Sequence, residues 1–312
     1  MRTFPEVIDF YIPGFEKSYP LGSTKTLALQ DRDCREWFHE CVDQVISSCG
    51  VRFLPICRMS DGEFLFILGE QAVDIRLSLA EKIRQRLSRI KHHIVLKGGV
   101  GPFTAGHYHS GHFSAAEWHS ARTEVPTLIK AISEKGILAW HLNFTAVPFH
   151  ERYFPALEKW IVRHKVLVTT ANYYPFYFIY ALLTGPRRSE LLKGRRVLVI
   201  NGAEGEKQRK ITDGLLNEGV AEVLWCKISL KRSYFETIDI TPFIGRVDLA
   251  LVGAGIGKLK LFQHLEPLGV PCIDAGFVFE VWADPNNRFK RVYCASDANW
   301  EELGSSPQLA GI

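Results

Sequence analysis

VRFLPICRMSDGEF (residues 51–64) joins a mainly apolar run to a short acidic segment. Residues 51–56 are typical of a buried strand, because the run is short, apolar and rich in strand-forming side chains. In extended backbone, successive side chains alternate between two faces, so Asp61 and Glu63 are expected to point the same way. Gly62 between them adds no side chain and permits backbone angles that a close ligand requires. The stretch therefore predicts a strand that leads to two carboxylates able to share one cation.

Asp61 and Glu63 are candidate metal ligands and catalytic residues. Hard ions such as Mg²⁺ and Mn²⁺ favour carboxylate oxygens, usually one or two, while substrate phosphates and water complete the shell. Arg58 is suited to gripping a phosphate or to holding a carboxylate in place. A structural interpretation is also open, because Ser60-x-x-Glu63 before an apolar run is a capping box that opens a helix. The two interpretations are compatible, since phosphates bind where a strand end meets a helix N-terminus.

Residues 58–63, RMSDGE, resemble the Arg-aromatic-Gly-Asp-Gly-Glu signature of the GT-D-type glycosyltransferases, a bacterial family. The resemblance implies a Rossmann-like fold and an Asp-x-Glu metal motif. In that motif Asp61 and Glu63 would hold Mn²⁺ or Mg²⁺. Met59 and Ser60 depart from the signature, which has an aromatic residue and a glycine at these positions.

A second segment, VPCIDAGF over residues 270–277, is similar to the closing strand and Asp-x-Gly-His segment of the same family. Phe277 stands in the place of the histidine, so no role of that histidine is carried over. Asp274 in this segment and Glu204 after an earlier strand are candidate general bases. Each also has a structural alternative, because a carboxylate at a strand end can cap the next helix.

The composition is that of a globular protein with ample apolar content for a large core, since 46% of the 312 residues are hydrophobic and 23% are charged. Residues 1–30, rich in Pro, Gly and aromatics, are interpreted as an N-terminal arm. Residues 31–284 are interpreted as one Rossmann-like catalytic domain and residues 285–312 as a polar tail. The net charge of +4 is mild, which favours acidic small ligands over nucleic acid as partners.

The seven cysteines include no Cys-x-x-Cys pair, which argues against a disulfide framework or a cysteine zinc site. The N-terminus has no apolar segment of signal-peptide length, and no run of about 18 apolar residues occurs elsewhere. We therefore expect a cytoplasmic protein without a transmembrane segment. The basic side of a helix expected over residues 72–90 would allow peripheral membrane association.

Hydrophobic periodicity predicts the elements of the first half of the chain. Helices are predicted over residues 33–48, 72–90, 117–135 with a break near Pro126, and 155–164, and strands over 94–97, 137–140 and 165–170. Residues 173–180 form an aromatic block. We interpret this block as a buried helix and its interface, with a sugar-stacking surface as the alternative.

From residue 194 onward, strands and helices alternate regularly. Strands are predicted over residues 197–200, 223–226, 247–252 and 271–274, and helices over 207–217 and 259–268. Repeated strand, glycine turn and helix units imply parallel strands with right-handed crossovers. The sequence thus predicts an α/β fold with a Rossmann-like, mostly parallel sheet and helices on both faces.

The glycine turns after these strands are candidate diphosphate sites, because each exposes backbone N–H groups at a helix start. The candidate cofactor-binding residues are Gly62, Gly202, Gly253, Gly255 and Lys258. Lys258 would neutralise phosphate. Gly253-x-Gly255-x-Gly257 lacks the spacing of a dinucleotide fingerprint, and an alternative is that the glycines serve only to permit tight turns.

Two further loops carry polar candidates. His107, His109 and His112 would suit a metal, sugar hydroxyls or a base, or would be ordinary surface groups. His141 and Asn143 follow the strand predicted over residues 137–140. Ligands collect at the carboxyl ends of strands in open α/β sheets, although Asn143 would also suit a turn.

Together these features predict a metal-dependent glycosyltransferase that uses a nucleotide sugar, expected to be a UDP-sugar, and a glycan or glycoprotein acceptor. Arg58 would hold a phosphate or orient the metal pair. Two alternatives stay open. A methyltransferase that uses S-adenosylmethionine would explain the strand and glycine loop over residues 197–205, but residues 225–227 end the next strand without an acidic side chain. A non-catalytic nucleotide-binding scaffold of a glycan assembly complex is the other alternative.

Overall fold

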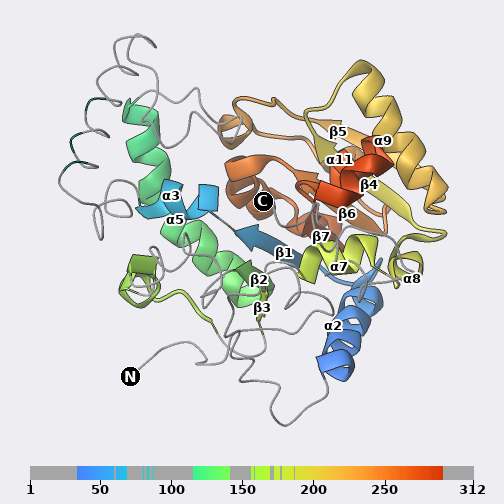
Figure 1. Ribbon diagram of the computed structural model, residues 1–312, viewed down its shortest axis with the longest axis horizontal. Helices are drawn as coiled ribbons and strands as arrows, with labels where there is room; N and C mark the ends of the chain where they lie inside the picture. The colour runs from blue at the N-terminus through green and yellow to red at the C-terminus, as the bar shows by residue number, and fades with distance from the viewer. Residues whose placement is uncertain are drawn as a thin grey trace.

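The structure, a computed structural model, describes residues 34–59, 61–68, 80, 83, 87, 115–140, 156–157, 159–168, 172–175, 178–185 and 187–290. Seven strands in this part of the chain form one sheet (Figure 1). They are β1 (Leu54–Met59), β2 (Ile137–Trp140), β3 (Tyr173–Pro175), β4 (Arg196–Asn201), β5 (Glu222–Lys227), β6 (Leu249–Gly253) and β7 (Pro271–Asp274). Their order is β3-β2-β1-β7-β6-β4-β5, and adjacent strands run parallel. The predicted parallel sheet is confirmed.

Helices cover both faces of this sheet, which confirms the predicted Rossmann-like α/β fold. The described α-helices are α2 (Cys34–Ser48), α3 (Asp61–Leu68), α5 (Ala115–Lys135), α7 (Phe178–Thr184), α8 (Arg188–Leu192), α9 (Gly205–Asn217), α10 (Lys258–His264) and α11 (Val278–Ala283). Buried side chains of α3, α5 and α10 join one apolar cluster, and those of α2, α7, α8, α9 and α11 join another. Strand β4 alternates between them, since Leu198 belongs to the first cluster and Val197 and Val199 to the second.

The second half of the chain follows the sequence prediction closely. Strands β4 to β7 lie on the predicted apolar runs, and α9 and α10 lie between them as expected. Such strands are easily recognised, because a parallel sheet is covered on both faces and its strands read as continuous apolar runs. In the first half, α2 and β2 are also where the periodicity predicts them.

The strand predicted over residues 165–170 is wrong, because the described residues 165–168 form no strand. Lys165 instead has a positive φ of 53° just after a helix, and Val166 and Val168 are buried in the first apolar cluster. The edge strand is β3, which lies inside the block that we expected to be helical and pairs with β2. An apolar run indicates that a segment is buried but does not say how. Residues 166 and 168 are buried by packing against the cluster and not as part of a strand.

Some predicted boundaries also differ. Helix α5 continues through Pro126, because the side chains that it buries against the sheet offset the loss of one backbone hydrogen bond. Strand β1 extends to Met59 instead of ending at Ile56. The start of the predicted tail forms a 3₁₀ helix, η7 (Pro285–Lys290), in which Asn287 Nδ2 donates to the carbonyl of Glu280 at 2.8 Å.

Several predictions fall outside the described residues. These are the arm over residues 1–30, the strand over 94–97, the histidines between 107 and 112, His141 and Asn143. Of the helix predicted over residues 72–90, positions 80, 83 and 87 are described and are helical. In the described part of the chain, no helix has both the length and the apolar character needed to cross a membrane.

The connections define where the strand ends can meet a ligand. Strand β4 leads through α9 to β5 on the outer side, whereas its neighbour β6 leads through α10 to β7 in the opposite direction. Helices α9 and α10 accordingly pack on opposite faces. In open α/β sheets, the carboxyl ends of strands next to such a reversal are the usual ligand-binding edge. The ends of β1, β7, β6 and β4 all lie at this edge, because the strands are parallel.

Candidate functional site

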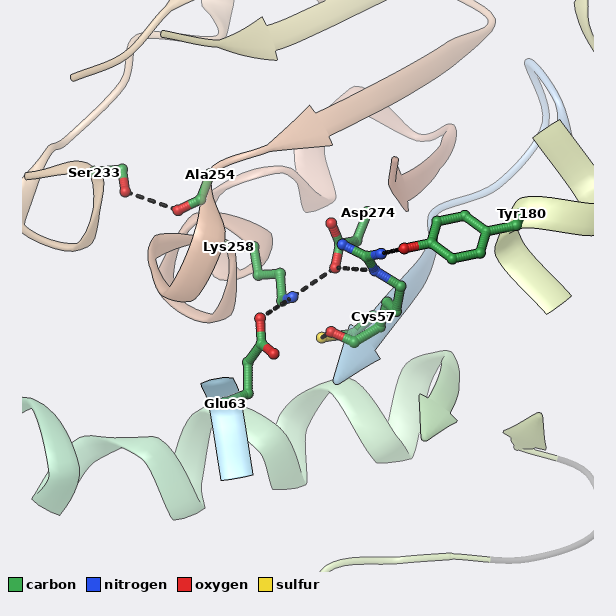
Figure 2. Close-up of polar contacts among 8 residues, drawn as sticks. Cys57, Glu63, Tyr180, Ser233, Ala254, Lys258 and Asp274 are labelled. Atoms are coloured by element: carbon green, nitrogen blue, oxygen red, sulfur yellow. Dashed lines mark hydrogen bonds and ion pairs between the residues drawn. The ribbon is translucent and has the colours of Figure 1, made fainter. Parts of the chain in front are cut away.

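Four charged side chains form a buried cluster at the carboxyl ends of β1 and β7. We call Arg58, Glu63, Lys258 and Asp274 the charge cluster. Figure 2 shows the Lys258 side chain between Glu63 and Asp274. Lys258 Nζ lies 2.6 Å from Glu63 Oε1 and 2.6 Å from Asp274 Oδ2, and Arg58 Nε lies 3.6 Å from Asp274 Oδ2. The cluster thus links the two sequence segments that resemble GT-D-type glycosyltransferases.

The topology explains why these residues meet. Arg58 is near the end of β1 and Asp274 is the last residue of β7, and these two strands are adjacent and parallel. Glu63 is in the first turn of α3, which follows β1. Lys258 begins α10, just after the short 3₁₀ helix η5 (Gly255–Gly257) that follows β6. Strand ends that are distant in sequence are therefore neighbours in space.

A close backbone approach positions Lys258. Ser233 Oγ donates a hydrogen bond to the carbonyl of Ala254 at 2.8 Å, which holds the loop before η5 (Figure 2). A Cβ atom at Gly257 would lie 2.3 Å from Ser233 Oγ, so only glycine fits between this loop and the start of α10. This contact accounts for one glycine of the Gly-x-Gly-x-Gly run.

The charge cluster is nearly closed to solvent. The exposed fraction is 1% for Lys258, 3% for Glu63 and 1% for Asp274. Burial lowers the pKa of Lys258, but the carboxylates of Asp274 and Glu63 raise it by more, so the pKa stands above its ordinary value. Lys258 is therefore a buried ammonium ion with two carboxylate partners. Burying ions is costly unless such partners compensate them.

Arg58 is held on several sides. Its Nη1 donates to the hydroxyl of Tyr180 on α7, and its guanidinium carbon lies 5.1 Å from the centre of the Tyr180 ring. A Cβ atom at Gly276, which has a φ of +47°, would lie only 1.8 Å from Arg58 Nη2. The glycine of the Asp-x-Gly segment thus makes room for the guanidinium. Phe277 packs edge-on against Tyr180, with ring centres 6.4 Å apart.

The backbone of the acidic segment differs from the expected extended loop. Helix α3 begins at Asp61, so Asp61 and Glu63 lie in its first turn. The extended-chain argument for a common direction is therefore wrong, and the helical alternative is confirmed for the backbone. Ser60 and the side chain of Asp61 lie outside what the structure describes, as does any side-chain cap.

Carboxylate chemistry at this segment fits the expected cation. Glu63 offers the kind of oxygen donor that Mg²⁺ and Mn²⁺ prefer, two residues after Asp61 and at a helix N-terminus. One of its oxygens, Oε1, is already in contact with Lys258. Among the described side chains, no group of three or more His, Cys, Asp or Glu residues is arranged to hold a metal ion.

Gly202, Gly253 and Gly255, three of the predicted glycine residues, have packing or backbone roles in the described structure. A Cβ atom at Gly202 would lie 2.7 Å from Leu230 Cγ, and one at Gly253 would lie 2.6 Å from the ring of Phe279. Gly255 has a φ of +52°, in the region that favours glycine. These contacts favour the structural alternative for the glycine turns, although they leave the neighbouring N–H groups as candidates for a ligand.

Asn201 and Tyr180 are polar residues at this edge that the sequence analysis missed. Asn201 Nδ2 donates to the carbonyl of Gly253 at 3.0 Å, and Oδ1 accepts from the N–H of Ala203 at 2.8 Å. Asn201 thereby ties the end of β4 to the end of β6. Its place at the end of an apolar strand was a usable signal, whereas the contact of Tyr180 with Arg58 depends on long-range packing alone.

The two candidate bases differ in their surroundings. Asp274 is buried between Lys258 and Arg58, and these contacts favour a positioning role over proton abstraction from an acceptor. Glu204 lies before α9 and is exposed, and it forms an ion pair of 2.7 Å with Lys227 at the end of β5. Cys57, beside the cluster, is not a nucleophile candidate, because burial raises the pKa of its thiol far above the ordinary value.

Comparisons with known proteins give one likeness. No protein-family model matches the sequence, and no curated protein matches it either. Among solved structures, the chain is similar to one described as the selenomethionine-substituted structure of domain of unknown function 1792 (DUF1792). The sequence identity is 14%, the TM-score is 0.43, and the match covers 78% of this chain and 85% of that chain.

Proposed function

We propose that this chain is a metal-dependent glycosyltransferase that takes a UDP-sugar as donor and a glycan or glycoprotein as acceptor. One observation carries the proposal. The two segments that resemble GT-D-type enzymes, residues 58–63 and 270–277, lie side by side, with Arg58 Nε 3.6 Å from Asp274 Oδ2. A resemblance spread over distant parts of a sequence gains weight when its residues converge on the edge of the sheet where ligands usually bind.

The chain's own residues would build a rigid electrostatic site. Arg58 would hold a phosphate or orient the metal pair, and Asp274 and Tyr180 fix its guanidinium in place for either role. The N-terminus of α3 directs backbone N–H groups towards the same end of β1, which favours a phosphate there. Donors and charges that are fixed before the substrate binds stabilise charge in a transition state without reorganising.

The expected cation would be held by Asp61 and Glu63. When bound, Mn²⁺ or Mg²⁺ would neutralise charge on the leaving nucleoside diphosphate. The four charges of the described cluster sum to zero, so the charge of a cation would be balanced by Asp61 and by the diphosphate itself. This balance is consistent with a metal that binds tightly only together with the nucleotide.

A thermal-shift experiment tests the proposal. We expect UDP to raise the melting temperature when Mn²⁺ is present, and the shift to be lost in Asp61→Asn and Glu63→Gln. Glu134→Gln is a matched control, because Glu134 is half exposed on α5 and its ion pair with Lys130 is 3.9 Å long. Glu134→Gln should keep the rise in melting temperature with UDP and Mn²⁺. In a turnover assay with a panel of UDP-sugars, it should release UDP at the rate of the unmodified protein.

Two results would contradict the proposal. The first is full sugar transfer by both Asp61→Asn and Glu63→Gln. The second is stabilisation by S-adenosylmethionine in the absence of metal together with no response to UDP, which would favour methyl transfer.

A further inference from the structure

We infer that Lys258 is a positioning residue for the acidic segment and does not contact the phosphates of the donor. The inference deepens the proposed function and rests on it. The sequence alone suggests the opposite, because a lysine after a glycine turn is a natural phosphate ligand. The geometry of the charge cluster leads to the other assignment.

Burial is the first argument. Lys258 is 1% exposed, and its single nitrogen already lies between two carboxylates, whereas Glu63 can give one oxygen to Lys258 and the other to a cation. The Lys258 ammonium group can donate three hydrogen bonds, and two carboxylates already lie 2.6 Å away. Arg58 has a 13% exposed side chain and is the more accessible cation of the cluster.

Connectivity is the second argument. Lys258 starts α10, Glu63 belongs to α3 and Asp274 ends β7, so one ammonium group joins three separate elements. Figure 2 shows its side chain reaching from α10 into the space between the two carboxylates. The direction of the Glu63 carboxylate, and with it the donor set of the proposed metal pair, is therefore set by Lys258.

Charge balance makes the inference testable. The cluster holds two carboxylates and two cations. Lys258→Met leaves it with a net charge of −1, whereas Lys258→Met combined with Glu63→Gln restores neutrality. If Lys258 and Glu63 act as one unit, their substitutions are strongly non-additive, as expected for residues in contact.

The experiment combines a stability cycle with binding and turnover. Urea midpoints are measured for Lys258→Met, Glu63→Gln and the double variant. We expect Lys258→Met to have the lowest midpoint and the double variant to recover part of the loss. If Lys258→Met does not accumulate as soluble protein, recovery of soluble protein by the double variant is the same test.

Binding and turnover of Lys258→Met separate positioning from phosphate binding. We expect the Kd for UDP at saturating Mn²⁺ to stay within about threefold of the unmodified protein while kcat falls by at least about tenfold, because excess metal offsets the weaker hold of a displaced Glu63 carboxylate but does not restore its position. The matched control is Lys260→Met, on the same helix, where Lys260 is partly exposed and 3.4 Å from Glu124. The control should leave midpoint, Kd and kcat unchanged.

Two results overturn the inference. One is a rise of tenfold or more in the Kd for UDP, on the scale of a lost charged contact, with kcat preserved at saturating donor. The other is additive stability changes in the cycle. Failure of the proposed function is a separate outcome, since the unmodified chain would then neither bind UDP nor transfer sugar, while the stability cycle would still report on the contact of Lys258 with Glu63.

Discussion

Ion pairs occur at opposite edges of the sheet, and the two edges differ in how far these pairs are buried. At the amino edge, Arg196 at the start of β4 pairs with Asp248 before β6, with Nη2 2.8 Å from Oδ1 and side chains that are 43% and 20% exposed. At the carboxyl edge, Lys258 and Asp274 have side chains that are 1% and 2% exposed. An ion pair of a basic and an acidic side chain is therefore partly exposed to water at the amino edge and almost fully buried at the carboxyl edge.

The difference in burial is consistent with a structural role for the pair at the amino edge and with the proposed site for the pair at the carboxyl edge. An exposed pair such as Arg196 and Asp248 contributes modestly, because water screens it and little desolvation is required. Buried ions must overcome a large desolvation penalty, and apolar residues of similar size often stabilise a protein as well or better. The buried charge cluster contributes little to stability by this argument, which supports the functional role that we propose for it.

The largest expected effect comes from Asp274→Asn. Lys258 and Arg58 would both lose a carboxylate in a buried place, and we expect the free energy of unfolding to fall by about 3–5 kcal/mol, the range for breaking a buried ion pair. Urea unfolding at neutral pH measures it. Asp248→Asn is the matched change at the amino edge and should cost about 1 kcal/mol or less. Equal losses at both edges would remove the distinction between them.

The second effect concerns the room that Gly276 leaves for Arg58. Gly276→Ala should displace the guanidinium and lower sugar transfer by roughly tenfold, because small misplacements in a site reduce rates strongly. Gly269→Ala is the matched control, since Gly269 has a φ of +63° and a Cβ atom added there would meet nothing within 4 Å. Both variants should lose about 1 kcal/mol of stability from the positive φ. Equal rates of sugar transfer by Gly276→Ala and Gly269→Ala would show that activity does not depend on the position of the Arg58 guanidinium.

A smaller effect is expected from Tyr180→Phe. The substitution removes the hydroxyl that accepts from Arg58 but keeps the ring beneath the guanidinium, so we expect a stability loss of about 1 kcal/mol and a measurable fall in kcat. Tyr174→Phe removes another buried hydroxyl, which donates to Gln44 Oε1 at 2.7 Å away from the charge cluster. It should cost similar stability and leave kcat unchanged. A fall in kcat in both Tyr180→Phe and Tyr174→Phe would show that the effect comes from a general loss of packing and not from the contact with Arg58.

The smallest effect is the acid sensitivity of the amino edge. The hydrogen bonds from Arg196 lower the pKa of Asp248 below its ordinary value. A lowered folded pKa means that the contribution is complete above the unfolded pKa, about 3.9, and is lost as the pH falls through the folded value. Asp248→Asn should therefore lower the free energy of unfolding at neutral pH, by about 1 kcal/mol or less, and should flatten the loss of stability below about pH 4, where the unmodified protein loses the same contribution. An unchanged acid limb would contradict this assignment.

The sequence predicted much of the fold, because burial on both faces leaves a plain signal in β4, β6 and β7. It failed at β3, where residues 173–175 are Tyr-Tyr-Pro and the described part of the apolar run before them is packed without strand pairing. Whether an apolar segment forms a paired strand depends on its neighbours in the folded protein, and hydrophobic periodicity does not contain that information.

The site was predictable in its members more than in its arrangement. Arg58, Glu63, Lys258 and Asp274 were all singled out by residue type and position, but their contacts were not. Glu63 and Lys258 are separated by 195 positions in the chain, so no local pattern reveals that they pair. For the same reason the sequence did not reveal the contact of Arg58 with Tyr180, which is 122 positions away in the chain.

A crystal structure of the chain with UDP and Mn²⁺, recorded at the manganese absorption edge, tests the central claim most directly. We expect an anomalous peak between the carboxylates of Asp61 and Glu63 and the diphosphate, with Lys258 still in contact with Glu63 and Asp274. A diphosphate bound elsewhere, or manganese distant from both carboxylates, would contradict the account.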